Sequence, residues 1–170
     1  VELARQYIAS GKVDALQIAY SALRQKAAQF FAEAQQAGVG IVARQVLEAG
    51  FLTGKYKPGD RFTWPDHRTR YEDEHRDELL RDVQENFVPL LPEGYDSPAQ
   101  MAIKFVLANP NVDTIVLGAN KESQVVRNVA VDGLPPLPDE VLKKIKELYN
   151  HRNDDFNPTG TLEHVPSPRE

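Results

Sequence analysis

The chain has 170 residues, of which 41% are hydrophobic and 26% are charged, and this composition is typical of one ordinary globular domain. Its formal net charge of −5 argues against a surface that holds nucleic acid or anionic lipid through phosphate groups. The lack of cysteine excludes disulfides, thiolate metal ligands and a cysteine nucleophile. No apolar run is long enough to cross a bilayer and no signal peptide is recognisable, so we expect a cytoplasmic location.

The first quarter of the chain predicts helices alternating with strands. Apolar spacing predicts a helix over residues 2–10, and the apolar run at 13–21 predicts a strand that is buried on both faces and carries one polar side chain, Gln17. A second helix is predicted over 25–37, followed by a second buried strand over 40–44. The amino terminus lacks an initiator Met and a helix-capping residue, which indicates a sequence that begins partway through a longer chain.

The rest of the chain predicts one further strand among several helices and loops. Apolar residues at a period near 3.6 predict a long charged helix over 72–90. Ser97 is a good cap for the next helix, and a proline directly follows it. The predicted elements are a loop over 57–71, helices over 72–90 and 98–108, a strand over 113–117, helices over 122–129 and 138–150, and a loose tail from 151.

The alternation of strands and helices predicts a parallel α/β sheet. Only three strands are recognisable, so two apolar sheet edges would stay open to water or to another chain. The four histidines have no zinc-like spacing with a supporting ligand, and no metal site is expected.

Two stretches are candidates for an anion site. After the third strand, Gly118 and Lys121 lie at the start of a helix, where unpaired N–H groups and the helix dipole favour a phosphate, and Gln124 and Asn128 share one face that suits a flat heterocycle. An ordinary helix start explains the same residues, and on spacing alone it is the favoured reading. After the second strand, cations in the segment LTGKYKPGD lie where α/β folds place ligands, although a solvated turn explains them equally.

Three segments resemble a known family. The runs LEAGFLTGKYKPGDRF, LGANKESQVVRN and LQIAYS are similar to the carboxyl-terminal part of the aldo-keto reductases, above all bacterial members related to potassium-channel β subunits. The resemblance implies a TIM barrel that binds NADPH and transfers a hydride to an aldehyde or ketone. It implies that residues 1–150 form the last three of eight βα units, strands six to eight and the cofactor-binding part, with residues 151–170 as a tail.

The resemblance also implies which residues bind NADP(H). Gln17 matches the side-chain amide that meets the nicotinamide carboxamide. The other matches are Gln45, Leu47 and Ala49 around the pyrophosphate, Thr53, Lys55 and Arg61 at further phosphate contacts, Gly118, Asn120 and Lys121 at the adenosine 2′-phosphate, and Gln124, Arg127 and Asn128 around the adenine.

The sequence departs from the family pattern in two places. Arg44 stands where most members have an aromatic residue stacked on the nicotinamide, and Gln45-Val46 replaces Ser-Pro. Arginine also lies flat on rings and binds phosphate, so cofactor binding is compatible with the change. The family's catalytic Asp, Tyr, Lys and His come from units that match nothing here, and no residue, Tyr20 included, is given a catalytic role.

A barrel of this kind takes about 250 residues, so three strands cannot close one. The sequence therefore predicts the NADP(H)-binding part of a carbonyl-reducing enzyme whose amino-terminal barrel half lies in the same or another chain. Two alternatives stay open: a noncatalytic subunit that binds NADP(H) or docks on a partner, and an inactive fragment.

Overall fold

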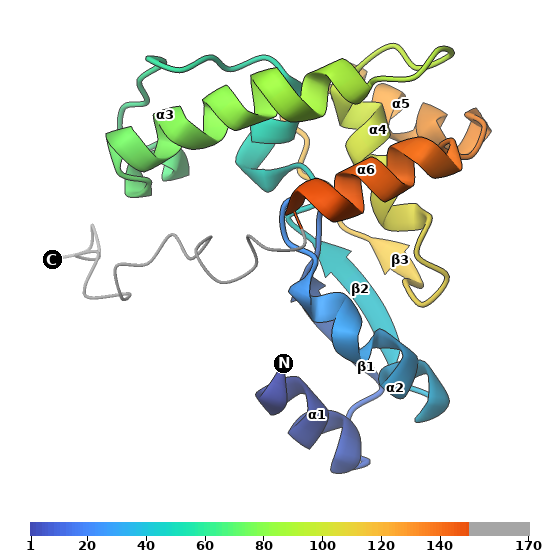
Figure 1. Cartoon of the computed structure of the whole chain (residues 1–170). Helices are drawn as coiled ribbons and strands as arrows, with labels where there is room; N and C mark the ends of the chain where they lie inside the picture. Colours follow the sequence, from blue (N-terminus) through green and yellow to red (C-terminus); the bar gives the residue numbers. More distant parts are fainter. Residues whose placement is uncertain (150–170) are drawn as a thin grey trace, which may run out of the picture.

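A parallel sheet of three strands, flanked by helices, organises the chain in the computed structural model, which describes residues 1–149 (Figure 1). The strands are β1 (Ala15–Ala19), β2 (Gly40–Arg44) and β3 (Thr114–Ile115), in the spatial order β1-β2-β3. The α-helices are α1 (Glu2–Ala9), α2 (Phe31–Gln36), α3 (Asp73–Asp82), α4 (Pro98–Leu107), α5 (Glu122–Val129) and α6 (Asp139–Tyr149). Shorter helical segments are η1 (Lys26–Phe30), η2 (Glu48–Thr53), η3 (His67–Arg70), η4 (Val83–Phe87), η5 (Val88–Leu90) and η6 (Ala130–Gly133).

The strand register divides the sheet into two faces. Ile18 pairs with Ala43, which in turn pairs with Ile115, and paired residues in parallel strands point to the same face. Gln17 pairs with Val42 and therefore lies on the opposite face. We call the face of Gln17 and Val42 the open face, because no described element lies on it.

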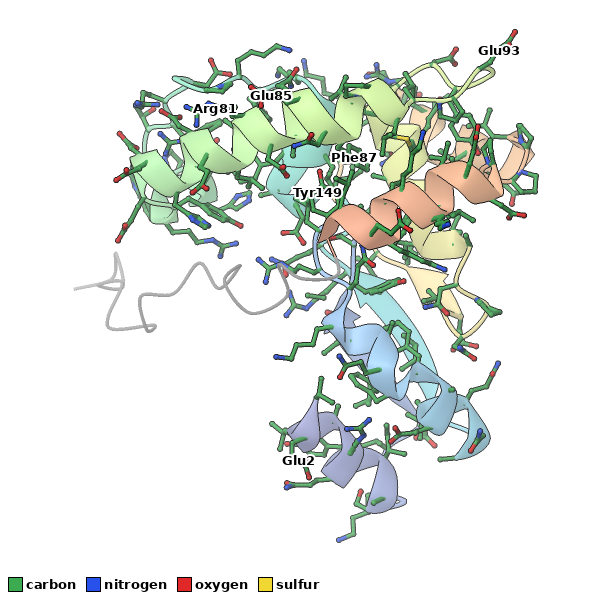
Figure 2. All side chains as sticks on the ribbon, in the orientation of Figure 1. Glu2, Arg81, Glu85, Phe87, Glu93 and Tyr149 are labelled. Carbon is green, nitrogen blue, oxygen red and sulfur yellow. The ribbon has the colours of Figure 1, made fainter. Side chains whose placement is uncertain are left out.

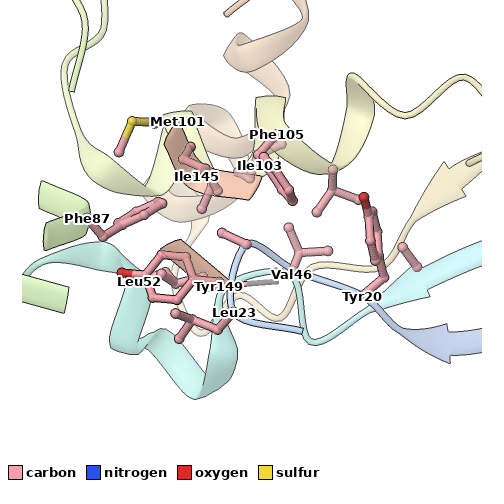
Figure 3. Close-up of a cluster of buried hydrophobic side chains, with 14 of the residues drawn as sticks. Tyr20, Leu23, Val46, Leu52, Phe87, Met101, Ile103, Phe105, Ile145 and Tyr149 are labelled. Carbon is pink, nitrogen blue, oxygen red and sulfur yellow. The ribbon is translucent and has the colours of Figure 1, made fainter. Parts of the chain in front are cut away.

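Helices and loops bury the other face of the sheet. Ile41 and Ala43 of β2 are fully buried and belong to one hydrophobic cluster with Phe31 and Ala34 of α2, which packs on this strand. The cluster continues beyond the carboxyl ends of the strands, where Figure 3 shows Val46 among side chains from α4 and α6. The core thus lies between the sheet and the helices on one side only.

The long helix α3 continues as a π-helical turn, η4, and crosses the top of the molecule in Figure 1, next to α6. Figure 2 shows Arg81 and Glu85 on its outer side, whereas Phe87 and Tyr149 lie between the helices with ring centroids 6.5 Å apart. Within residues 1–149, no helix is long and apolar enough to span a membrane.

Most of the predicted elements are confirmed with shifted ends. The helix over 122–129 is observed at those residues, and Ser97 caps α4 by accepting a hydrogen bond from Gln100 N–H. The strands β1 and β3 are shorter than predicted, β2 is observed at the predicted residues 40–44, and the helix predicted over 25–37 is a 3₁₀ turn followed by α2. The tail and residue 150 lie outside the described residues.

The prediction that the first strand is buried on both faces is wrong. Ala15 and Gln17 are exposed, and so is Thr114 on β3, because the described part of the chain covers only the opposite face. A strand rich in apolar residues predicts burial, but the sequence of a single strand does not reveal which element supplies the cover.

Candidate functional site

The candidate site lies at the carboxyl edge of the sheet. All three strands are parallel, so the loops that follow them begin at this edge. Val116 N–H donates to the Ala43 carbonyl oxygen at 2.8 Å, and Tyr20 N–H donates to the Arg44 carbonyl oxygen at 3.2 Å. The chain segments that leave β1, β2 and β3 therefore start side by side, and residues far apart in sequence meet here.

Gln17 and Arg44 lie on the open face of the sheet. Ala19 pairs with Arg44 in the register, so Gln17 stands on the neighbouring strand, one side-chain step nearer its start. Both side chains are exposed, and Arg44 makes no ion pair with a described residue. A cofactor ring lying on this face would have an amide and a guanidinium within reach.

The loop after β2 has a strained backbone. Gln45, Glu48 and Ala49 have φ angles of 57°, 45° and 54°, in the left-handed region that costs residues other than glycine about 1–2 kcal/mol each. Gly50 follows with φ 90°. Such conformations persist only where the surroundings hold them, and they cluster at ligand sites.

The N–H groups of this loop fall into two sets. Glu48 N–H donates to the Gln45 carbonyl oxygen and Gly50 N–H donates to the Leu47 carbonyl oxygen, both at 2.9 Å. Within residues 1–149, the N–H groups of Leu47 and Ala49 have no such acceptor. Free N–H groups in a loop that joins a right-handed residue, Leu47, to left-handed ones, Glu48 and Ala49, can form a concave site that suits an anion.

A buried polar cluster joins this loop to the loop after β1. The Glu48 side chain is completely buried, and its Oε1 accepts hydrogen bonds from Ser21 Oγ at 2.7 Å and Arg24 Nε at 2.8 Å. Burial raises the pKa of the Glu48 carboxyl, and the nearby charge of Arg24 opposes that rise. We call Ser21, Arg24 and Glu48 the loop anchor.

The loop after β3 forms the second part of the site. Gly118, Asn120 and Lys121 are exposed and lead into α5, and Lys121 makes no ion pair with a described residue. Gln124 Oε1 accepts hydrogen bonds from the N–H groups of Asn120 at 2.7 Å and Lys121 at 3.3 Å. The oxygen of Gln124 therefore accepts from the N–H groups at the start of α5.

The remaining α5 candidates lie farther along the helix. Arg127 is exposed and its Nε donates to the Ser123 carbonyl oxygen at 3.1 Å, whereas Asn128 is half-buried. A shallow depression is lined by Glu122, Ser123, Val126 and Arg127. The helix thus offers both polar and apolar surface close to Lys121.

Three predicted phosphate contacts have other local partners. Thr53 Oγ1 donates to the Gly50 carbonyl oxygen at 2.6 Å, and the Lys55 ammonium lies 5.2 Å from the centroid of the Tyr56 ring without an ion pair to a described residue. Arg61 makes ion pairs with Asp73 and Asp77 of α3, each at 3.1 Å. In this arrangement Lys55 is free to meet an anion, while Arg61 would first have to leave its carboxylates.

The loop anchor is a part of the site that the sequence did not predict. Glu48 is a charged residue between apolar neighbours, in the segment that the family resemblance matches to the pyrophosphate. The one signal for it was the acidic residue in a run that otherwise enters the core. Its partners, Ser21 and Arg24, are 27 and 24 residues away, a separation that no local pattern bridges.

No metal site or catalytic constellation is recognisable among residues 1–149. No group of His, Asp or Glu residues in this part could hold a metal ion, and His151 and His164 lie outside it. Tyr20 is buried, with its ring 5.1 Å from Phe31, and its hydroxyl accepts a hydrogen bond from Asn109. Burial raises the pKa of Tyr20.

Comparison with known proteins identifies related sequences. The model of the aldo/keto reductase family matches residues 5–150. A probable voltage-gated potassium channel subunit beta from Oryza sativa is 36% identical over 121 residues, which cover 68% of this chain and 37% of that protein. Protein tas of Escherichia coli is 32% identical over 144 residues, which cover 81% of this chain and 40% of that protein. The chain therefore spans less than half the length of these relatives.

Solved structures share the fold at lower sequence identity. An aldo-keto reductase from Bacillus halodurans superimposes with a TM-score of 0.65 at 22% identity, over 89% of this chain and 50% of that one. The glycerol dehydrogenase of Gluconobacter oxydans gives a TM-score of 0.68 at 22% identity, over 85% of this chain and 45% of that one. The three strands and their helices are thus a partial barrel that corresponds to half of a reductase chain.

The narrower assignment to the carboxyl-terminal part of a bacterial branch is wrong as stated. The channel β subunits of rice and Arabidopsis thaliana match at 36% and 35% identity, above the 32% of the bacterial Tas protein. Together with the family match at residues 5–150, these relatives support a fragment of the family that is related to both groups. The chain belongs to the aldo/keto reductase family.

Proposed function

We propose that this chain is the NADP(H)-binding part of an aldo-keto reductase, which reduces an aldehyde or ketone when the rest of the barrel is present. The observation that carries the proposal is the meeting of two loops at one sheet edge. The strained loop after β2 supplies free N–H groups at Leu47 and Ala49, and the segments that leave β2 and β3 carry the exposed cations Arg44 and Lys121. Backbone donors and unpaired cations are the groups that bind the phosphates of a dinucleotide.

The proposal gives each candidate residue a role in holding the cofactor. The nicotinamide ring, when bound, supplies the hydride. Gln17 would hold its carboxamide on the open face, and Arg44 would lie on the ring or meet a phosphate. The remaining candidates would bind the pyrophosphate (Gln45, Leu47, Ala49), further phosphate oxygens (Thr53, Lys55, Arg61), the 2′-phosphate (Gly118, Asn120, Lys121) and the adenine (Gln124, Arg127, Asn128).

Hydride transfer also needs groups that protonate and orient the carbonyl. In the family these are Asp, Tyr, Lys and His residues, and in this proposal they come from the remaining barrel half, in the same or another chain. Residues 1–150 would form the cofactor-binding part, residues 151–170 a separate tail, and the protein would act in the cytoplasm on a small carbonyl compound. The purified chain alone is therefore expected to reduce no test aldehyde with NADPH.

Lys121 provides the test of cofactor binding. The Lys121→Glu variant is expected to weaken NADPH binding by about tenfold or more and to leave NADH binding nearly unchanged, because a carboxylate would repel the 2′-phosphate. Fluorescence titration of both cofactors measures the two affinities. Lys12→Glu is the matched control, since Lys12 is exposed at the opposite edge of the sheet, before β1. Equal weakening of NADPH and NADH would remove Lys121 from the site, and a chain that binds neither would contradict the proposal.

A second candidate function is a noncatalytic subunit that binds NADP(H) and docks on a partner. The observation that favours it is the 36% identity to a protein described as a potassium channel subunit beta. The two functions separate when the missing barrel half is added: aldehyde turnover supports the reductase, whereas NADPH binding without turnover supports the binding subunit. An inactive fragment would bind no cofactor in either preparation.

A further inference from the structure

We infer that Glu48 is a positioning residue: through Arg24 and Ser21 it holds loop 45–50 in its left-handed conformation and so aims the N–H groups of Leu47 and Ala49 at an anion. The identity of that anion, the diphosphate of a dinucleotide, rests on the proposed function. The geometry of the loop and its anchor does not.

The loop needs an anchor because its backbone is strained. Left-handed backbone at Gln45, Glu48 and Ala49 disfavours this conformation by several kcal/mol in sum, at about 1–2 kcal/mol for each residue. Hydrogen bonds within the loop join Glu48 to Gln45 and Gly50 to Leu47, but these are short-range and would tolerate other turns. A contact from outside the loop is required to select one conformation.

Glu48 supplies that contact from the strained position itself. Its own φ angle is 45°, and its side chain turns away from the site into full burial. There it meets Arg24 and Ser21, which belong to the loop after β1. One residue therefore contributes the turn with its backbone and attaches it to the neighbouring loop with its carboxylate.

The inner side of the same loop is fixed by apolar packing. Figure 3 shows Val46 and Leu23, each only 1% exposed, pointing into one hydrophobic cluster. This packing holds the two loops together, yet apolar contacts have no direction and do not choose the orientation of a peptide group. The anchor adds directional side-chain contacts between the two loops.

An ordinary core role explains Glu48 less well. Burying a carboxylate costs several kcal/mol, and a buried ion pair is often no more stable than apolar residues of similar volume. Here the Oε2 atom of Glu48 is buried without a hydrogen-bond partner, so part of that cost is not recovered. A residue selected for core stability alone would be apolar, whereas a residue that fixes the backbone conformation of a loop needs a directional hydrogen bond or ion pair.

Hydrogen exchange of the chain tests the anchor without any ligand. The variant Glu48→Gln keeps the size of the side chain and removes the charge that meets Arg24. We expect the amides of Glu48, Gly50 and Leu52 to exchange about tenfold faster, while the amides of α4 keep their protection, because only the local opening becomes easier. Glu33→Gln is the matched control, since it breaks the exposed ion pair of Glu33 with Arg5, far from the loop.

Ligand binding tests whether the loop anchor positions the N–H groups of Leu47 and Ala49 for a diphosphate. In Glu48→Gln the affinity for NADPH is expected to fall about tenfold, because misplaced donors lose most of their contact with a phosphate. The affinity for 2′-AMP, which has no diphosphate, is expected to stay unchanged. A general loss of stability would weaken both ligands, so the difference between them separates positioning from simple support of the fold.

The outcomes decide the inference and the proposed function separately. Unchanged exchange of the loop amides in Glu48→Gln overturns the inference, as does an equal loss of protection in α4. If the loop opens but the wild-type chain binds neither NADPH nor 2′-AMP, the anchor stands and the cofactor proposal fails. Should Glu48→Gln not fold, the milder Ser21→Ala variant decides by the same exchange pattern, and a second failure to fold assigns the cluster to stability and overturns the inference.

Discussion

At the scale of single residues, one arginine organises the long loop between η2 and α3. The Arg68 guanidinium carbon lies 4.4 Å from the centroid of the Tyr56 ring and 4.1 Å from that of Phe62, so this cation contacts both rings. The same side chain makes a two-point contact with Asp66 at 2.5 and 2.9 Å. A Cβ added at Gly50 would lie 3.4 Å from Tyr56, so this cluster packs directly against loop 45–50.

The pH dependence of stability reports on this cluster. Arg68 lowers the pKa of Asp66 from its ordinary value of 3.8 to about 2. A lowered carboxyl pKa stabilises the folded chain above about pH 4, and this contribution is lost as the pH falls from about 4 to 2. Asp66→Asn, which can still cap η3, is expected to lower the free energy of unfolding by about 1 kcal/mol at pH 6, a value reduced for partial exposure.

Urea unfolding at several pH values measures this contribution. The difference between wild type and Asp66→Asn is expected to shrink toward zero near pH 2. Asp132→Asn, which removes an exposed carboxylate without an ion pair to a described residue, is the control and is expected to change little at any pH. A difference for Asp66→Asn that stays constant down to pH 2 would contradict the role of its ionised form.

At the scale of elements, the end of η2 is fitted closely against α4 and η5. Gly54 ends η2 with a φ angle of 71°, and a Cβ at this position would lie 3.1 Å from Pro98 Cγ and 3.3 Å from Val88 Cγ2. Gln84 from η4 also donates to the Gly54 carbonyl oxygen at 3.0 Å. The segment that follows β2 is therefore held at its far end, Gly54, by the helices, just as the loop anchor holds it near β2.

Alanine at Gly54 tests this fit. We expect Gly54→Ala to lower the free energy of unfolding by about 2–4 kcal/mol, because a left-handed backbone and an overpacked contact both add cost. Gly59→Ala is the control: Gly59 has a φ angle of 93° with no atom within 4 Å of an added Cβ, so only the backbone cost of about 1 kcal/mol applies. Urea unfolding of the two variants compares their losses in free energy of unfolding. Equal losses would show that the surroundings of Gly54 are not crowded.

At the scale of the whole molecule, the chain presents an incomplete surface. Gln17, Arg44 and Thr114 on the open face are exposed, and β1 and β3 each leave an edge without a neighbouring strand in the described part of the chain. Figure 1 shows α1 at the end of the sheet remote from α3, and its apolar residues Leu3 and Tyr7 are 61% and 50% exposed. Such surfaces are typical of association sites, which agrees with a chain that spans half of its structural relatives.

Self-association of the isolated chain tests whether the open face is an association surface. We expect the isolated chain to associate at high concentration, and Val116→Lys to reduce this association without changing the unfolding midpoint, because Val116 is half exposed at the outer strand β3. Sedimentation at several concentrations gives the average mass. Val129→Lys on α5 is the control, since Val129 is 68% exposed away from the strands. A chain that stays monomeric, or an equal effect of both lysines, would show that the sheet is not the associating surface.

Local patterns were sufficient for much of the fold. The helix over 122–129 and the cap at Ser97 follow from hydrogen bonds between near neighbours, which the sequence specifies directly. The inner positions of the long helix, such as Leu79 and Phe87, follow from a period of 3.6 and are buried as predicted. The ends of strands were less predictable, since a strand ends where its partner ends.

The candidate site was only partly accessible to sequence reasoning. Family resemblance selected the loops after β2 and β3, and the structure places these loops side by side. The loop anchor was missed because its members are distant in sequence, and the partners of Arg61 on α3 were missed for the same reason. Contacts between distant residues depend on how the elements pack, which no local pattern encodes.

The sequence by itself determined most of the helices, the parallel α/β arrangement and the family to which the chain belongs. These depend on hydrophobic periodicity, on capping and on motifs that are each contiguous in the chain. Only the tertiary structure decided which sheet face is covered, that Gln17 and Arg44 share the open face, and that Glu48 is buried beneath a strained loop. Burial and backbone strain are properties of the packed molecule, because each depends on neighbours that folding brings together.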